Sequence, residues 1–408
     1  MRAPGETIST QNLRFYRRPS VMKLLFVSNL FPDQNEPWRG LDNVTLVHAL
    51  REIEPQMEVR VLAFRPSLKT SSELSHLSPR AEDVVLNPRY FGYHYLPKAG
   101  GLNHWWFERS LEAAQKSVLA DFKPDAVLAP WLFPDACAVA RYAAKRGIPV
   151  VAVAQGSDVH QYLGMPMRRR AILELSRQAK CIVTRSHDLE LRLIKAGAAP
   201  ERLQTIYNGV DTKLFRPASK AEARAELKVP PEGRLLLFVG NFLPVKGIDM
   251  LLESLALVIK NSSEPIRLAL IGSGPLEPAL KQQATELGLL DKLIFVGRQP
   301  SSGVARWMQA ADAVCLTSHN EGVPNVVLES LSSGRAIIST DVGGISEIIE
   351  PIMSKRFLVG TRDKQAFASA VMDALAHPVD EEALHQKALP FSWENCARNY
   401  LALLSSGV

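Results

Sequence analysis

The stretch Leu235-Leu236-Leu237-Phe238-Val239-Gly240 is an apolar run that stops at a glycine, and it decides the fold class of this chain. A run that is apolar on both faces indicates a buried strand of a parallel sheet. A helix is predicted to begin after Lys246-Gly247, because apolar residues then recur at helical spacing, at Ile248, Leu251, Leu252 and Leu255. A buried strand followed by an amphipathic helix is the repeating unit of an α/β fold.

The same alternation of short apolar runs and helical patterns extends along the chain from residue 22. The strands predicted in the first half are Lys23–Ser28, Val59–Phe64, Ala126–Ala129, Val150–Ala154 and Cys181–Thr184. Those predicted in the second half are Leu235–Val239, Leu268–Ile271, Leu293–Val296, Ala313–Leu316 and Ala336–Ser339. We therefore predict two consecutive doubly wound, Rossmann-like domains, whose ligands lie at the carboxyl ends of the strands.

A polar, proline-bearing stretch from Phe215 to Gly233 separates the two series of strands and marks the domain boundary. The length of 408 residues also fits two domains. The predicted parts are a disordered extension at residues 1–21, an N-terminal domain at 22–213, a C-terminal domain at 214–392, and a helix at 393–408 that packs back on the N-terminal domain. Met22 would make a natural start.

Charge is distributed unevenly between the two halves. Residues 1–210 hold 28 Lys and Arg against 20 Asp and Glu, a net charge of +8, while the remainder holds 20 against 22, a net of −2. Such asymmetry favours an anionic partner for the first half: an anionic lipid surface, a phosphorylated acceptor or nucleic acid. A solvated surface without a partner fits the charge equally well.

Composition excludes several classes of protein. A hydrophobic content of 46% with 22% charged residues is that of a globular chain and not of a disordered one. The longest apolar runs are too short for a membrane-spanning helix. The cysteines are far apart, so we expect buried thiols in a reducing, cytoplasmic compartment and no zinc site; they are Cys137, Cys181, Cys315 and Cys396.

A second chemical signal is the run Glu321-Gly322-Val323-Pro324-Asn325-Val326-Val327-Leu328-Glu329. Pro324 suits the first position of a helix, which we predict to run through Leu331. Glu321 would then lie in the loop before the helix and Glu329 inside it, both facing the cleft between the domains. The free N–H groups of Asn325 and Val326 would be available to phosphate oxygens.

Lys246 is expected at a helix N-terminus, where the helix dipole already favours an anion, so its charge would suit a pyrophosphate. A surface lysine and two unrelated surface acids are the alternative. The glycine-rich stretch Gly272-Ser273-Gly274-Pro275 follows a strand but lacks the third glycine of a dinucleotide-binding loop, which argues against a nicotinamide cofactor.

The two signals together resemble the retaining GT-B glycosyltransferases of family 4, which have two Rossmann-like domains facing across a cleft. The resemblance covers nearly the whole chain from Met22. Further segments that carry it are Asn208–Asp211, Leu270–Pro275, Phe295–Gly297 and Asp341–Glu347. Two segments of the first half, Trp131–Asp135 and Gly156–Val159, resemble the teichuronic-acid and exopolysaccharide enzymes of bacteria.

The resemblance implies roles for individual residues. Lys246 would contact the diphosphate of a UDP- or GDP-sugar, Glu329 the ribose and Glu321 the donor sugar near its anomeric carbon, without an obligatory metal. Glu321 and Lys246 are thus the catalytic candidates. The remaining donor-binding candidates are Gly240, Asn241, Gly297, Arg298, Asn325 and Val326, with Arg298 near the base. Candidates of the N-terminal domain, on the acceptor side, are Gly40, Gln155, Gly156 and Asp158.

Two positions depart from the family pattern. Asn241 stands where an arginine commonly follows the glycine of the phosphate loop, so one cationic contact is missing or comes from elsewhere, for example from Arg298. Gln155 stands where many relatives have a histidine that touches the donor sugar. An amide cannot titrate near neutral pH, so Gln155 is a poor general base. His160 is close in sequence, although lone histidines are more often packing residues.

The implied activity is that of a retaining hexosyltransferase that builds a surface polysaccharide on a glycan or lipid-linked acceptor. It would work in the cytoplasm, peripherally at the inner face of an anionic plasma membrane, and without nucleic acid. Trp105-Trp106-Phe107 would touch the membrane, hold an acceptor or pack in the core, and Arg168-Arg169-Arg170 would meet anionic groups or solvent. The alternatives are a GT-B-fold sugar-nucleotide epimerase and a non-catalytic sugar-nucleotide-binding subunit.

Overall fold

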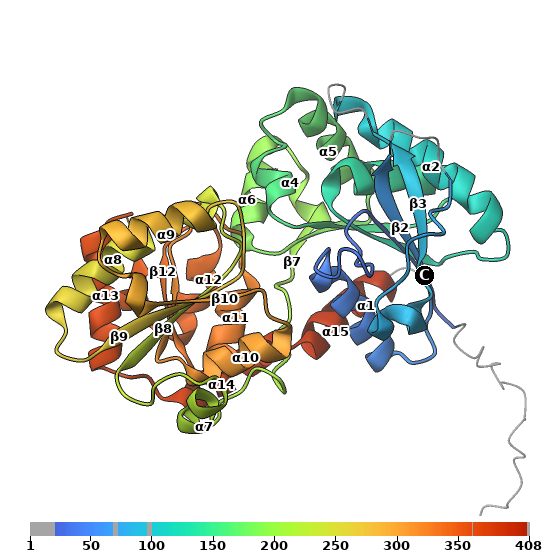
Figure 1. The fold of residues 1–408 in the computed structure, drawn as a ribbon. Helices are drawn as coiled ribbons and strands as arrows, with labels where there is room; N and C mark the ends of the chain where they lie inside the picture. Colours follow the sequence, from blue (N-terminus) through green and yellow to red (C-terminus); the bar gives the residue numbers. More distant parts are fainter. Residues whose placement is uncertain (1–20, 68–71, 96–99, 361, 406–408) are drawn as a thin grey trace, which may run out of the picture.

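The computed structural model describes residues 21–67, 72–95, 100–360 and 362–405. We expected residues 1–21 to be disordered. All of them except Val21 lie outside the described residues. The chain forms two bodies, each built on one sheet, that lie side by side in Figure 1.

The first sheet has seven strands in the order β3-β2-β1-β4-β5-β6-β7, with every pair parallel. Its strands are β1 (Lys23–Ser28), β2 (Glu58–Ser67), β3 (Arg89–His94), β4 (Ala126–Pro130), β5 (Val150–Ala154), β6 (Cys181–Thr184) and β7 (Leu203–Thr205). The central strands are almost fully buried, because helices cover both faces of the sheet. All five strands predicted for the first half are confirmed, three of them with identical ends.

The second sheet has six parallel strands in the order β10-β9-β8-β11-β12-β13. They are β8 (Arg234–Val239), β9 (Ile266–Ile271), β10 (Leu293–Gly297), β11 (Ala313–Leu316), β12 (Ala336–Thr340) and β13 (Leu358–Val359). The five strands predicted here are confirmed as well. The prediction omitted β3, β7 and β13, three of the four edge strands, whereas the fourth, β10, was predicted. The omitted strands are short or carry polar residues and so lack the apolar run that β10 has.

The helices of the first body are α1 (Leu41–Ile53), α2 (Asn103–Val118), α3 (Cys137–Ala144), α4 (Ser157–His160), α5 (Pro166–Gln178) and α6 (His187–Ala196). Those of the second are α7 (Lys220–Glu226), α8 (Ile248–Asn261), α9 (Glu277–Glu286), α10 (Ser301–Ala310), α11 (Asn325–Ser332), α12 (Ile345–Ile352), α13 (Lys364–Ala376) and α14 (Glu381–Ala388). No helix in the part of the chain that the structure describes is long and apolar enough to cross a membrane.

The last helix, α15 (Trp393–Ser405), lies against α1 of the first body (Figure 1). Its residues Ala397, Tyr400 and Leu404 are buried in the same apolar cluster as the core of α1. The chain therefore crosses between the bodies twice, once after β7 and once before α15. All four cysteines are buried, free thiols, as the sequence predicted.

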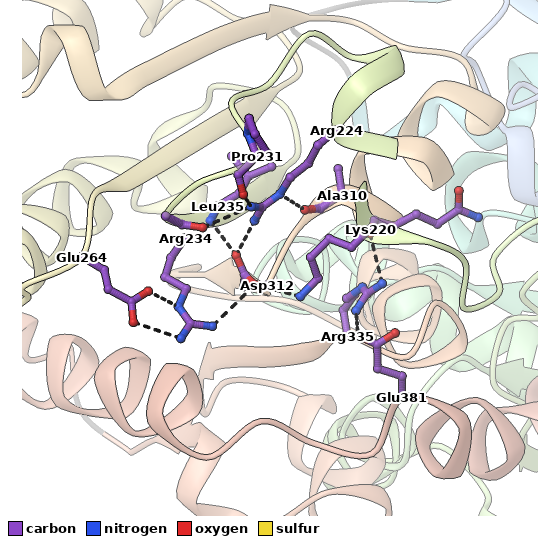
Figure 2. A network of polar contacts seen from close by, with 12 residues as sticks. Lys220, Arg224, Pro231, Arg234, Leu235, Glu264, Ala310, Asp312, Arg335 and Glu381 are labelled. Atoms are coloured by element: carbon purple, nitrogen blue, oxygen red, sulfur yellow. Dashed lines mark hydrogen bonds and ion pairs between the residues drawn. The ribbon is translucent and has the colours of Figure 1, made fainter. Parts of the chain in front are cut away.

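A cluster of charged residues surrounds Asp312 at the amino end of the second sheet (Figure 2). The Asp312 carboxylate accepts hydrogen bonds from Lys220 Nζ at 2.8 Å, from an Arg224 guanidinium nitrogen at 2.7 Å and from the Leu235 N–H at 2.7 Å. Arg234 lies 3.9 Å away. Since Lys220 and Arg224 belong to α7, this carboxylate fastens the helix that follows the domain crossing to the starts of β8 and β11.

Replacing this carboxylate should destabilise the second body. An Asp312→Ala variant leaves the buried Arg224 guanidinium without its charge partner, and breaking a buried pair in this way costs about 3 kcal/mol. Urea unfolding followed by circular dichroism should show a markedly lower midpoint. Asp291→Ala removes the partner of Lys292 at an exposed site and serves as the control. Equal midpoints for the two variants would show that the cluster contributes nothing.

Candidate functional site

Three loops meet closely where β8, β9 and β10 end. The Gly240 N–H donates to the Ile271 carbonyl at 3.0 Å, and the Gly272 N–H donates to the Gly297 carbonyl at 3.0 Å. Gly272 has a φ of +132°, and a Cβ there would lie 1.9 Å from the Gly240 carbonyl oxygen. Glycine is therefore required at 272, because only a residue without a side chain lets the loops approach this closely. The three loops are therefore packed together at the carboxyl ends of the strands.

Lys246 and Glu321 come together although 75 residues separate them. Lys246 ends a short 3₁₀ turn (Pro244–Lys246), and Gly247, with a φ of +57°, is the N-cap of α8. Lys246 Nζ lies 2.5 Å from Glu321 Oε1, and the Ser318 hydroxyl donates to the same oxygen at 2.6 Å. The carboxylate thus orients a cation at the N-terminus of a helix, a position that favours a bound anion.

The N-terminus of α11 lies next to this pair. Pro324 is the N-cap and not the first helical residue, so the helix begins one position later than predicted and ends at Ser332. Among the described residues, no carbonyl accepts the N–H of Asn325 or of Val326. The Glu321 carbonyl packs on Gly343, where a Cβ would lie 1.9 Å from it. The two free N–H groups and Lys246 are donors suited to phosphate oxygens.

Glu329 faces a cavity of about 200 Å³ between the two bodies. Leu41, Asp42 and Thr45 of α1 line it on the side of the first body. The other helices that line it are α10, through Ser301, α11, through Asn325 and Glu329, and α15, through Trp393. Burial, together with the nearby charge of Asp42, raises the pKa of Glu329 to about 7. This acid therefore changes its charge near neutral pH and can accept hydrogen bonds from a hydroxyl-bearing ligand.

A hydrogen-bonded network across the interface holds the two bodies together beside this cavity. Asp42 accepts from Asn325 Nδ2 at 2.6 Å, from an Arg185 guanidinium nitrogen at 2.8 Å and from Asn208 Nδ2 at 3.1 Å. Asn208 Nδ2 also donates to Asn325 Oδ1 at 2.8 Å. The side chain of Asn325 is therefore engaged across the interface, which leaves only its backbone N–H for a ligand.

A second contact across the interface is made by Glu347 of α12. Its two carboxylate oxygens accept from the N–H of His187 at 2.7 Å, from the N–H of Asp188 at 2.8 Å and from the Tyr207 hydroxyl at 2.8 Å. A carboxylate of the second body thus caps α6 of the first. Sequence reasoning missed Asp42 and Glu347 as interface residues and Arg185 as a partner of Asp42, since partners 140 to 283 residues apart leave no local pattern.

On the side of the first body, Gly40 is the left-handed N-cap of α1, with a φ of +65°, and a Cβ there would lie 2.2 Å from the Leu30 carbonyl oxygen. Asp158 is fully buried and accepts hydrogen bonds from the N–H groups of Leu132, Gln155 and Gly156, each at 2.9 Å. Burial raises the pKa of this acid. Asp158 therefore fixes the loop that carries Gln155 and does not itself face the cleft.

The side chain of Gln155 points toward α1, where its Nε2 donates to Asn43 Oδ1 at 2.6 Å. His160, at the end of α4, lies near the Glu321 backbone, and burial lowers its pKa. Among the described residues His160 Nε2 has no hydrogen-bond partner. The imidazole thus lies beside the segment that carries Glu321.

Arg298 and Asn241 occupy the outer edge of the site. Asn241 is exposed at the end of β8. Arg298 Nε donates to the Ser273 hydroxyl at 2.7 Å, and its guanidinium lies 4.7 Å from the ring centre of Trp38, which belongs to the loop between β1 and α1. Arg298 therefore offers a cation on the side of the cleft where Asn241 offers none. The described residues contain no group of three or more His, Cys, Asp or Glu side chains that could hold a metal ion.

Comparison with known protein families gives two adjoining matches. The model of glycosyl transferases group 1 matches residues 219–389, and that of glycosyltransferase family 4 matches residues 43–214. The chain is 34% identical over 213 residues to a D-inositol 3-phosphate glycosyltransferase of Thermobispora bispora, an alignment that covers 49% of each chain. The chain spans about half the length of this and the similar inositol-phosphate relatives.

A longer alignment exists with TuaC of Bacillus subtilis, a glycosyltransferase assigned to teichuronic acid biosynthesis. It is 26% identical over 363 residues and covers 86% of this chain and 88% of TuaC. Among solved structures, Anabaena Alr3699/HepE in complex with UDP superposes with a TM-score of 0.73 at 20% identity, over 94% of this chain and all of that one. Sucrose-phosphate synthase from Thermosynechococcus elongatus gives 0.73 at 19% identity, over 94% and 98%.

The two parallel-sheet domains and these superpositions define a GT-B fold, as the sequence predicted. The two family matches together extend over most of the chain, from residue 43 to residue 389. The chain belongs to the group 1, family 4 glycosyltransferases.

Proposed function

We propose that this protein transfers a sugar, with retention of anomeric configuration, from a nucleotide-diphosphate sugar to a glycan or lipid-linked acceptor in the synthesis of a surface polysaccharide. The observation that carries the proposal is the Lys246–Glu321 pair, 2.5 Å apart at the N-terminus of α8. Glu321 stands four residues before Asn325, whose N–H has no acceptor among the described residues and which, like Glu329, lines the cavity between the two bodies. Family membership and the relation to TuaC support the reaction and its setting.

In the proposed reaction the bond between the anomeric carbon and the β-phosphate oxygen breaks, and the leaving diphosphate takes both electrons. Lys246 and the N–H groups of Asn325 and Val326 stabilise the negative charge that develops there. The acceptor hydroxyl forms the new bond on the face that the diphosphate leaves, and its proton passes to a departing phosphate oxygen. Glu321 positions Lys246 and faces the sugar. The products are the glycosylated acceptor and a nucleoside diphosphate.

The proposed donor is a UDP- or GDP-sugar. Glu329 would accept the ribose hydroxyls, and the loop at Gly297 and Arg298 would lie against the base. The complexes of Alr3699/HepE with UDP and with UDP-glucose support a uridine nucleotide. We place the enzyme in the cytoplasm, at the inner face of the membrane, because a lipid-linked acceptor would be presented there and the first half of the chain is basic.

A thermal-shift screen of sugar nucleotides tests the proposed donor. A ligand that binds only the folded protein raises its unfolding temperature in proportion to RT ln(1 + [L]/Kd). We expect stabilisation by one class of nucleotide-diphosphate sugar and by the matching nucleoside diphosphate, and none by NAD or by free sugars. If no sugar nucleotide stabilises the protein, the proposal is wrong.

Donor binding should strengthen as pH rises through about 7. The pKa of Glu329 is raised to about 7, so below this value the acid is mostly protonated and above it ionised. Ribose hydroxyls bond more strongly to the carboxylate, and a sugar nucleotide itself does not titrate here. We expect about tenfold tighter binding at about pH 8 than at about pH 6. Calorimetry with wild type and Glu329→Gln checks this, because the variant should show a flat profile.

A further inference from the structure

Two sequence features that the proposed reaction does not use lie together on the outer surface of the first body. The N-terminus of α5 packs against the 3₁₀ turn Gly100–Leu102 that leads into α2 (Figure 1). A Cβ at Gly101 would lie 2.8 Å from Met167 Sδ, and a Cβ at Gly100 would lie 2.7 Å from a guanidinium nitrogen of Arg168. The start of α5, which carries the arginine cluster, and the turn that leads into α2 therefore form one surface.

This surface exposes large apolar side chains. Leu102 is 43% exposed, Trp105 52%, Met165 43% and Met167 56%. Phe107, by contrast, is buried and Trp106 is half-buried, so Trp105 is the most exposed residue of the aromatic run. Single exposed apolar residues are common on protein surfaces, whereas several that lie close together mark an interaction site.

Arginines adjoin the apolar residues. Arg169, Arg170 and Arg177 line a hollow of about 370 Å³ along α5, together with Leu163, Pro166 and Leu173. Within the described residues no carboxylate lies within 4.0 Å of these three arginines. The acid of the same helix, Glu174, lies 3.8 Å from Arg141 instead. Arg168 is held over the ring of Tyr162 at 4.3 Å. Arg169 also donates to the Ala196 carbonyl at 2.9 Å. The hollow thus gathers three arginines that have no acidic partner within 4.0 Å among the described residues.

We infer that this surface, formed by the Gly100–Leu102 turn, Trp105 and α5 from Met165 to Arg177, binds the anionic lipid headgroups of a membrane. The inference rests on the proposed function only for the setting. Arginines that lack acidic partners complement lipid phosphates, and a hollow lined by both arginines and leucines suits a headgroup with its glycerol. The exposed tryptophan and methionines match side chains that enter the interfacial layer of a bilayer.

Co-sedimentation with vesicles tests the inference. We expect the full-length protein to bind vesicles that contain phosphatidylglycerol at low salt, to release them at high salt, and to ignore pure phosphatidylcholine. An Arg170→Glu/Arg177→Glu variant should bind about 30-fold more weakly, which corresponds to about 2 kcal/mol for two basic side chains at an anionic surface. Lys260→Glu/Lys292→Glu makes the same change in net charge on the second body and should bind like wild type.

The apolar part of the surface has its own readout. Trp105 emission should shift to shorter wavelength when phosphatidylglycerol vesicles are added, and the shift should vanish in Trp105→Phe. Met167→Ser should weaken vesicle binding, whereas Leu290→Ser, at a comparably exposed site of the second body, should not. All variants should keep the unfolding temperature of the wild type and its response to sugar nucleotides.

Wild-type protein that stays in the supernatant with phosphatidylglycerol at low salt would overturn the inference, and a protein partner would then be the occupant to seek. Equal vesicle binding by the two charge-reversal variants would overturn it too, since net charge alone would then explain the binding. In either case donor binding would be unaffected. If the wild-type protein binds the vesicles but no sugar nucleotide, that result would instead count against the proposed function.

Discussion

A Lys246→Ala variant should turn over the donor about 100-fold more slowly than the wild type. Lys246 Nζ lies 2.5 Å from Glu321 Oε1, beside the N-terminus of α8 and the free N–H groups of α11. In the proposed reaction Lys246 is a positive charge already in place where the leaving diphosphate gathers negative charge. Removing one such group typically raises the barrier by about 3 kcal/mol, or about 100-fold in rate.

Steady-state kinetics with saturating donor measures this effect, with Lys260→Ala, an exposed lysine of α8, as the control. Lys246→Arg should recover part of the activity, because the charge remains while its geometry changes. If Lys246→Ala retains nearly the wild-type kcat/KM, Lys246 is a surface residue of the loop and the proposed phosphate site is wrong.

The second large effect concerns donor affinity. Glu329→Ala should weaken binding of the donor and of the nucleoside diphosphate by about 10- to 100-fold, since charge-assisted hydrogen bonds contribute about 1.5–3 kcal/mol each. Calorimetry should be done above the pKa of about 7, where the wild-type side chain is ionised. Glu286→Ala, which removes an exposed acid of α9, is the matched control. Unchanged affinity in Glu329→Ala would remove this residue from the site.

The sequence predicted those parts of the fold that depend on local patterns. Buried parallel strands such as Lys23–Ser28 and Ala313–Leu316 are apolar on both faces, and both were located to the residue. The edge strand Arg89–His94 carries arginine, glycine and histidine, so its pairing with β2 arises from the neighbouring strand and not from its own pattern. Glycines such as Gly272 predicted where loops occur, but they did not predict which loops would pack against one another.

For the site, the sequence predicted that certain segments lie near one another but not how their side chains pair. The carboxyl ends of parallel strands meet at one edge, so Lys246 and the segment Glu321–Glu329 were expected near one another. The engagement of the Asn325 side chain by Asp42 required the relative placement of the two bodies, which no local pattern encodes. Asp158 carried a family motif, and only its three backbone partners identify it as the residue that fixes the loop.

The central claim is that the cleft between the domains holds a nucleotide-diphosphate sugar and activates its diphosphate as a leaving group. Release of nucleoside diphosphate from a panel of UDP- and GDP-sugars, measured with and without a glycan or lipid-linked acceptor, tests it most directly. The account predicts that wild-type protein releases nucleoside diphosphate from one class of donor, faster with acceptor, and that Lys246→Ala releases about 100-fold less. No release from any donor, or equal release by Lys246→Ala, would contradict it.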